Sequence, residues 1–291
     1  ASACLTNKTW QEALNNPTTI PEGLGGKLAM SNPMSPDYFY RVMTSNLDGT
    51  DHKIHAKGYD VSLSPDNRQI IYSSDTGLQL MDLKSGLVTP LIDTWKNDSD
   101  PIWSPDGSLI AFTRGSASGG IGAPGPYSIV IAKPDGTQQI PVVENGEANN
   151  VMAWFSDGKN LLYTVTGPNG ASVNSINIST MQISHYFNTN YIHSNIALSP
   201  DEKQVAHEVM LPGENYGIQI SDLDGSNPRL IVDAAPIVAT RPQWSPNGDW
   251  LVVSVSDESF LDTPVLALVE IDTCQIIPLT TIKGSVRTWN P

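Results

Sequence analysis

The 291-residue sequence contains few basic residues, few aromatic residues and no long apolar run. Its 16 lysines and arginines stand against 30 aspartates and glutamates, so the net charge is −14 at pH 7. A surface of that sign disfavours nucleic acid, whose phosphates need positive charge, and it disfavours anionic membranes for the same reason. No run of about 20 apolar residues is present, so we expect no membrane insertion.

Signatures of catalysis are also missing. The segment closest to a nucleophile elbow, residues 115–119, has Ala117 where the serine must stand. The five histidines do not have the spacing of metal ligands on a helix. These absences favour a protein without catalytic activity and leave an enzyme as the alternative.

The sequence does contain a repeat. A short apolar stretch followed by Ser-Pro-Asp-Gly or a related turn recurs about every 40 to 50 residues, which is the period of propeller blades. Each period also contains a second apolar stretch and an alternating stretch that ends in a tight turn, so it predicts four antiparallel strands. The six copies of the turn lie at residues 64–66, 104–107, 155–158, 199–201, 245–248 and 289–291.

The two ends of the sequence predict how the first blade is completed. The segment 26–31 matches a second strand with no first strand before it, and the segment 285–291 matches a first strand with nothing after it. We therefore expect a single all-β domain over 26–291, a six-bladed β-propeller of four-stranded antiparallel blades whose C-terminal strand completes blade 1. Residues 1–25 form an N-terminal arm in this interpretation.

The turns and tryptophans of the repeat are predicted to be structural. Proline presets φ, aspartate caps the turn and glycine accepts positive φ. The Asp-Gly turns between alternating strands, as at Asp48-Gly49, predict type I′ hairpins. Trp103, Trp154 and Trp244 are expected to pack between blades.

Only two cysteines are present, Cys4 and Cys274. Cys274 falls in the predicted turn between the third and fourth strands of the last blade, where the N-terminal arm can reach it. We expect a disulfide that ties the arm to this blade, with two unpaired thiols as the alternative. The start Ala1-Ser2-Ala3 resembles the product of signal cleavage, so export to the periplasm or the extracellular space is expected.

Ligand binding in a propeller is expected at the loops of one face and at the mouth of the central channel. The loops between second and third strands are the most irregular parts of the sequence and bring acidic and aromatic residues to one rim, which suits a basic or peptidic partner, a glycan or Ca²⁺. His193 is added because it precedes a first strand, and Asp60 and Asp100 are candidate ligands for Ca²⁺ or another cation in the channel. The rim residues are Asp37, Tyr38, Asp75, Tyr127, Glu214, Tyr216, Asp257, Glu258, Phe260 and Asp262.

The repeat resembles the PD40 or WD40-like repeats of TolB-type propellers. The resemblance is strongest over 103–136, and the segments 26–31 and 46–50 follow the same pattern. Related propellers occur in periplasmic TolB, beside the catalytic domain of prolyl-oligopeptidase-like peptidases and in polysaccharide lyases. The resemblance implies the propeller fold and is less specific for function. With the irregular loops of one face, we expect an exported, monomeric binding module for a protein or peptide; the alternative is a glycan-binding protein or a carbohydrate-active lyase or hydrolase.

Overall fold

The computed structural model describes the chain in two compact units, residues 1–57 with 193–291 and residues 58–192. Strands dominate both units, and the one helix of the described part spans nine residues. No helix in that part is long and apolar enough to cross a membrane. The structure describes residues 3–32, 40–92, 98–115, 127–144, 148–167, 170–189, 195–211, 215–233, 235–256 and 264–291.

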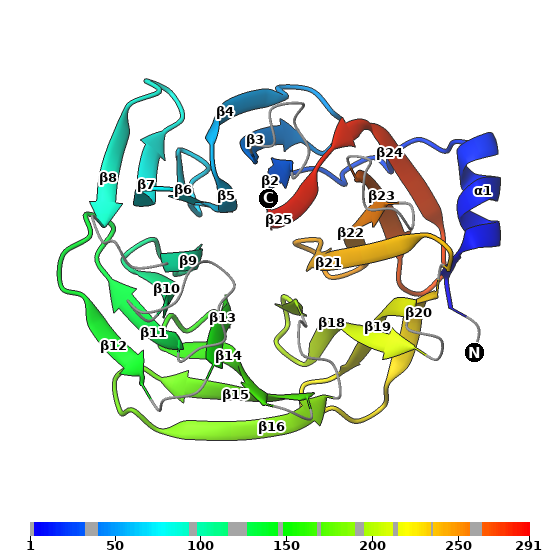
Figure 1. Cartoon of the computed structure of the whole chain (residues 1–291). Coiled ribbons are helices and arrows are strands. Elements are labelled where there is room, and N and C mark those ends of the chain that lie inside the picture. Colours follow the sequence, from blue (N-terminus) through cyan, green and yellow to red (C-terminus); the bar gives the residue numbers. More distant parts are fainter. Residues whose placement is uncertain are drawn as a thin grey trace. The chain divides into compact units, whose positions relative to one another are not determined.

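The fold is an all-β propeller of six four-stranded antiparallel blades, three in each unit (Figure 1). In the first unit, blade 1 contains β25, β2, β3 and β4, blade 5 contains β17 to β20, and blade 6 contains β21 to β24. In that order, the strands of blade 1 span Ser285–Asn290, Lys27–Asn32, Arg41–Asn46 and Lys53–Lys57. Those of blade 5 span Ile196–Leu198, Gln204–Leu211, Asn215–Asp222 and Arg229–Asp233, and those of blade 6 span Val238–Trp244, Trp250–Ser256, Val265–Glu270 and Ile276–Lys283.

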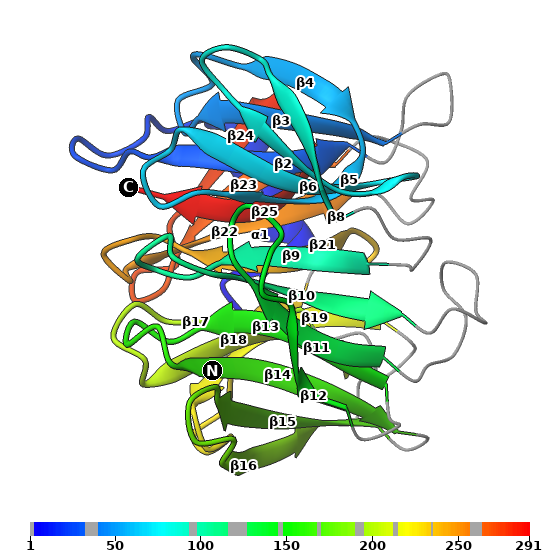
Figure 2. The ribbon, with the colours of Figure 1, turned by 90° about the vertical axis from the view of Figure 1, so that its left-hand side faces the viewer.

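The second unit contains blades 2, 3 and 4, formed by β5 to β8, β9 to β12 and β13 to β16. Blades 3 and 4 lie side by side, and a parallel bridge joins β11 to β13 (Figure 2). The strands span Tyr59–Leu63, Gln69–Ser74, Gly77–Asp82 and Val88–Ile92; Asp98–Trp103, Ile110–Gly115, Tyr127–Ala132 and Ile140–Val143; and Ala148–Trp154, Asn160–Gly167, Gly170–Asn177 and Ile183–Thr189.

The C-terminal strand completes blade 1, as the sequence predicts. β25 pairs antiparallel with β2, and Trp289 lies opposite Leu28. The Trp289 indole is buried and its Nε1 donates a hydrogen bond to the carbonyl of Gly25 over 3.0 Å. Gly26 has a φ of +123°, and a Cβ atom there would collide with the carbonyl of Asn290. Glycine is therefore required where the two ends of the chain pair.

The Ser-Pro-Asp turns have the structural role that the sequence predicts. In blade 3, the Ser104 hydroxyl donates to Asp106 over 2.7 Å and accepts the N–H of Leu109 over 2.9 Å. Hydrogen bonds from Ser104 and Ser108 lower the pKa of Asp106 to about 2. Gly107 takes the positive φ of the turn, 69°. The same serine-to-carboxylate bond recurs at residues 64 and 199.

The prediction of type I′ turns at the Asp-Gly hairpins is wrong. Gly49 has a φ of +83°, whereas Asp48 is not among the residues with positive φ. The N–H of Gly49 bonds the carbonyl of Asn46, and the Asp48 carboxylate accepts the N–H of Thr50. An aspartate that caps its own turn in this way needs only glycine to be left-handed, which is the arrangement of a type I turn followed by a G1 bulge.

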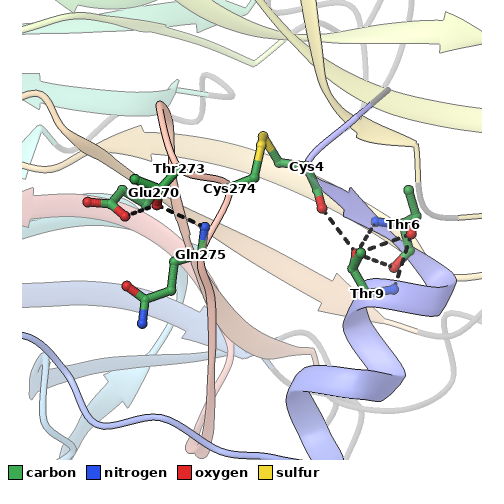
Figure 3. Close-up of a disulfide and its surroundings, with 7 residues drawn as sticks. All are labelled: Cys4, Thr6, Thr9, Glu270, Thr273, Cys274 and Gln275. Atoms are coloured by element: carbon green, nitrogen blue, oxygen red, sulfur yellow. Dashed lines mark hydrogen bonds between the residues drawn. A yellow bond between two sulfur atoms is a disulfide. The ribbon is translucent and has the colours of Figure 1, made fainter. Parts of the chain in front are cut away.

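The N-terminal arm contains two elements that the sequence did not predict. β1 (Leu5–Thr6) adds to the outer edge of β20 in parallel, and α1 (Asn7–Asn15) packs beside β24. Thr6 caps the helix, and Leu5 and Trp10 are buried in the core that blades 5 and 6 share. The predicted disulfide joins Cys4 to Cys274 (Figure 3). The arm is therefore tied to blade 6 covalently and to blade 5 by strand pairing.

Candidate binding site

The structure places some of the predicted site residues. Tyr127 and Asp75 lie in the second unit, at the start of β11 and in the turn between β6 and β7, and Tyr216 lies in β19 of the first unit. Asp60 and Asp100 lie in β5 and β9, the first strands of blades 2 and 3. The other predictions, Asp37, Tyr38, His193, Glu214, Asp257, Glu258, Phe260 and Asp262, lie outside the described residues.

Three of the predicted carboxylates in the second unit act on one tyrosine. Burial raises the pKa of the Tyr59 hydroxyl, and the charges of Asp60, Asp75 and Asp100 raise it further. Asp75 is exposed, whereas Asp60 and Asp100 are partly buried. The second unit therefore brings together an aromatic side chain and three acidic ones at the predicted rim and strand positions, a combination that suits a cationic ligand group.

A metal at Asp60 and Asp100 stays a prediction. Across the described ranges no group of three His, Cys, Asp or Glu side chains is arranged to hold a metal ion. Three of the histidines have protein partners instead. His55 bonds Thr44, His185 bonds Asn174, and His207 bonds a backbone carbonyl.

An irregularity recurs in the first strands, at the residue three positions before the final Trp or Leu. Asp60, Asp100 and Arg241 occupy this position in blades 2, 3 and 6 and have φ angles of 48°, 50° and 55°. A non-glycine residue in that region costs about 1–3 kcal/mol. Blades 4 and 1 have buried Val151 and Val286 there, without positive φ. Two residues oppose one at each strained site, which makes β-bulges of 60–61, 100–101 and 241–242.

A buried ion pair lies beside the bulge of blade 3. The Arg114 guanidinium donates to both carboxylate oxygens of Asp98 over 3.0 Å each and lies 5.0 Å above the ring of Phe112. Its Nη2 also donates to Gln139. The Asp98 side chain is fully buried, so this bidentate pair fixes the start of β9, two residues before Asp100.

The sequence analysis missed Glu208, although the repeat itself marks it. At the fifth position of the second-strand stretch, five blades have a buried serine or threonine and blade 5 has Glu208, of which only 3% is exposed. An alignment of the six repeats would have shown this exception. The hydroxyl residues are Ser31, Ser73, Thr113, Thr164 and Ser254.

In two blades this hydroxyl ties one blade to the next. Thr113 accepts the N–H of Val151 over 3.2 Å, and Ser254 accepts the N–H of Val286 over 3.0 Å. Glu208 makes the corresponding bond to the N–H of Arg241 over 2.8 Å. The carboxylate thus holds the backbone of the left-handed residue in blade 6, whereas the hydroxyls hold valines.

Glu208 also binds the equivalent residue of its own blade. Its Oε1 accepts a hydrogen bond from Asn195 Nδ2 over 2.9 Å, and Asn195 precedes β17. The Trp244 indole donates to the carbonyl of Ala197 over 3.0 Å, so β21 and β17 are joined a second time. The N–H of Arg241 is therefore held by a carboxylate that Asn195 also binds, and the Arg241 side chain is partly exposed.

The chain is similar in structure to several solved proteins. No protein-family model matches the sequence, and no curated protein matches it. TolB from Acinetobacter baumannii is 20% identical with a TM-score of 0.75 over 98% of this chain and 70% of that protein. A TolB-type protein from Agrobacterium tumefaciens is 18% identical with a TM-score of 0.69 over 91% and 92%.

A more distant similarity is to oligogalacturonate lyase from Vibrio parahaemolyticus, which is 10% identical with a TM-score of 0.56 over 94% of this chain and 89% of that one. Identities this low establish the fold alone. The fold is that of the TolB-like propellers, as the repeat predicts.

Proposed function

We propose that this protein is an exported, non-catalytic binding module that presents the loop-rich, acidic and aromatic face of its propeller to a protein or peptide. The observation that carries the proposal is the charge at the strained bulges. In the second unit Asp60 and Asp100 have left-handed backbones at one repeat position, where blade 4 has the buried Val151 of ordinary conformation. Bulges and strained residues accumulate where side chains must be aimed at a ligand.

The chemistry at these positions favours a peptide. The charges of Asp60, Asp75 and Asp100 act on Tyr59, so carboxylates and an aromatic ring lie within electrostatic reach of one another, a combination that suits the ammonium and guanidinium groups of a basic segment. The similarity to TolB proteins and the Cys4–Cys274 disulfide support export, because disulfides persist in oxidising compartments. The alternative, a carbohydrate-active enzyme or glycan binder, is not favoured because the lyase is the more distant neighbour in structure.

The test is a selection of random peptides on the immobilised protein, with a glycan array run in parallel. We expect basic, aromatic-containing peptides, and we expect Asp60→Asn together with Asp100→Asn to weaken their binding at least tenfold. Asparagine tolerates a left-handed backbone, so this double variant should fold.

The matched control removes two negative charges elsewhere, with Glu22→Gln and Asp272→Asn at exposed positions. It should bind the selected peptides as the unmodified protein does. The proposal is wrong if no peptide is selected, if glycans alone bind, if the bulge variant binds peptides normally, or if the protein cleaves oligogalacturonate into unsaturated products.

A further inference from the structure

The guanidinium of Arg241 has a donor without an acceptor. Its Nη1 is buried, and among the described residues it has no hydrogen-bond partner. Those residues also offer Arg241 no ion pair, although the buried Glu208 carboxylate bonds its backbone N–H. A buried donor left unsatisfied costs about 1–3 kcal/mol. No described residue satisfies this donor, so an acceptor supplied by a ligand would stabilise it.

Three features of the chain maintain this arrangement instead of relieving it. The backbone of Arg241 is left-handed, at a φ of 55°, and Pro242 follows it in the bulge. Glu208 replaces the serine or threonine of the other blades and accepts the N–H of Arg241. Asn195 donates to the same carboxylate oxygen and fixes its position.

The longer carboxylate explains how the strained residue is held. A hydroxyl at this repeat position accepts the N–H of an ordinary residue, such as Val286. A carboxylate reaches further, makes a stronger charge-assisted bond and can accept a second donor. Glu208 is used to hold the backbone of Arg241, so the charge of the guanidinium stays available to another group.

We propose that Arg241, in the first unit, is a carboxylate-binding subsite that receives one carboxylate of a bound peptide. The planar guanidinium offers paired donors that match a carboxylate bidentately, and its reorientation toward the ligand satisfies the donor that has no partner among the described residues. A net charge of −14 repels anions in general, so a carboxylate is retained only by a local cation of this kind. This inference rests on the proposed peptide-binding function.

The experiment uses the peptides selected on the full-length protein. Each Asp and Glu is replaced in turn by Asn and Gln, and the C-terminal carboxylate is replaced by an amide. We expect that neutralising one particular carboxylate of the peptide weakens its binding to the unmodified protein about tenfold or more. The same change in the peptide should not weaken its binding to the Arg241→Asn variant further. Asparagine is favoured in the left-handed region, so this variant keeps the bulge.

Two more variants separate charge from geometry. Arg241→Lys keeps the charge without the bidentate fork and should recover only part of the affinity. Glu208→Thr restores the residue type of the other repeats; it should remain folded, as judged by its urea midpoint, and should weaken binding of the same carboxylate. Arg68→Gln removes one positive charge at an arginine that is 81% exposed, and it should change nothing.

The outcomes distinguish the two proposals. If no peptide binds, the proposed function fails. If peptides bind but every carboxylate can be neutralised without loss, or if the loss is the same in Arg241→Asn, the subsite is wrong and the peptide site stands. If galacturonate oligomers compete for Arg241 and acidic peptides do not, the carboxylate belongs to a glycan and the inference is overturned.

Discussion

Removing the Trp289 side chain should destabilise the protein because this residue anchors the last strand of the chain in blade 1. Only 7% of Trp289 is exposed, and it packs in a core with Leu28, Met30 and Val286, all fully buried. A Trp→Ala change at such a site costs about 3–5 kcal/mol. At about 2–4 °C per kcal/mol for a chain of this order of size, Tm should fall by roughly 6–20 °C.

Urea and thermal unfolding followed by far-UV circular dichroism measure this loss. The control is Leu87→Ala, which truncates a side chain that is 66% exposed and should cost less than about 0.5 kcal/mol. Deleting 284–291 removes β25 entirely and leaves β2 without its partner, so the loss should approach the whole stability of about 5–15 kcal/mol. A truncated protein that stays monomeric with an unchanged Tm would refute the reasoning.

Three further predictions concern backbone, disulfide and pH. Gly26→Ala should destabilise the protein by several kcal/mol, on the scale of other core clashes. Its φ is +123° and its Cβ would collide with the neighbouring strand β25. Gly25 has nothing within 4 Å of such a Cβ, so Gly25→Ala should not destabilise the protein; calorimetry compares the two variants. Replacing Cys4 and Cys274 by serine should lower the free energy of unfolding by about 2–5 kcal/mol, which urea unfolding measures as a lower midpoint. A reducing agent should have no further effect on that variant. Burial lowers the pKa of His207, so the unfolded chain binds a proton first as the pH falls through about 6.5 and stability is lost below that value. His207→Gln should show a smaller loss between pH 7.5 and 5.5, and an equal loss would contradict the assignment.

The fold was predictable because repeats average out local ambiguity. Each copy of the turn predicts the same hairpin, so six weak signals agree. The second strand at 27–32 has no first strand before it, which identifies 285–290 as its partner. The cysteines were predictable because only one pairing exists. The Asp-Gly turns were misjudged because the aspartate side chain bonds the backbone two residues on, which the sequence pair alone does not reveal.

The site was less predictable than the fold. Asp60 and Asp100 could be singled out because an acidic residue at the start of an apolar first strand is unusual, and their role in binding stays a prediction. Glu208 was missed because a single charged residue in a strand attracts no notice by itself. It stands out only when its position is compared with the other five repeats, which have serine or threonine there. The local sequence does not reveal the left-handed backbone of Arg241. Pro242 follows it, and a residue before proline usually adopts an extended conformation, so the sequence predicts the opposite.

Amide hydrogen exchange of the protein, with and without a saturating selected peptide, tests the central claim most directly. If the strained first-strand residues aim their side chains at a partner, the peptide should slow exchange in the segments around Asp60 and Asp100, and the outer strand β16 of the same unit should exchange as before. Protection confined to that outer strand, with the bulges at Asp60 and Asp100 unchanged, would contradict the account and move the binding site to the edge of a blade.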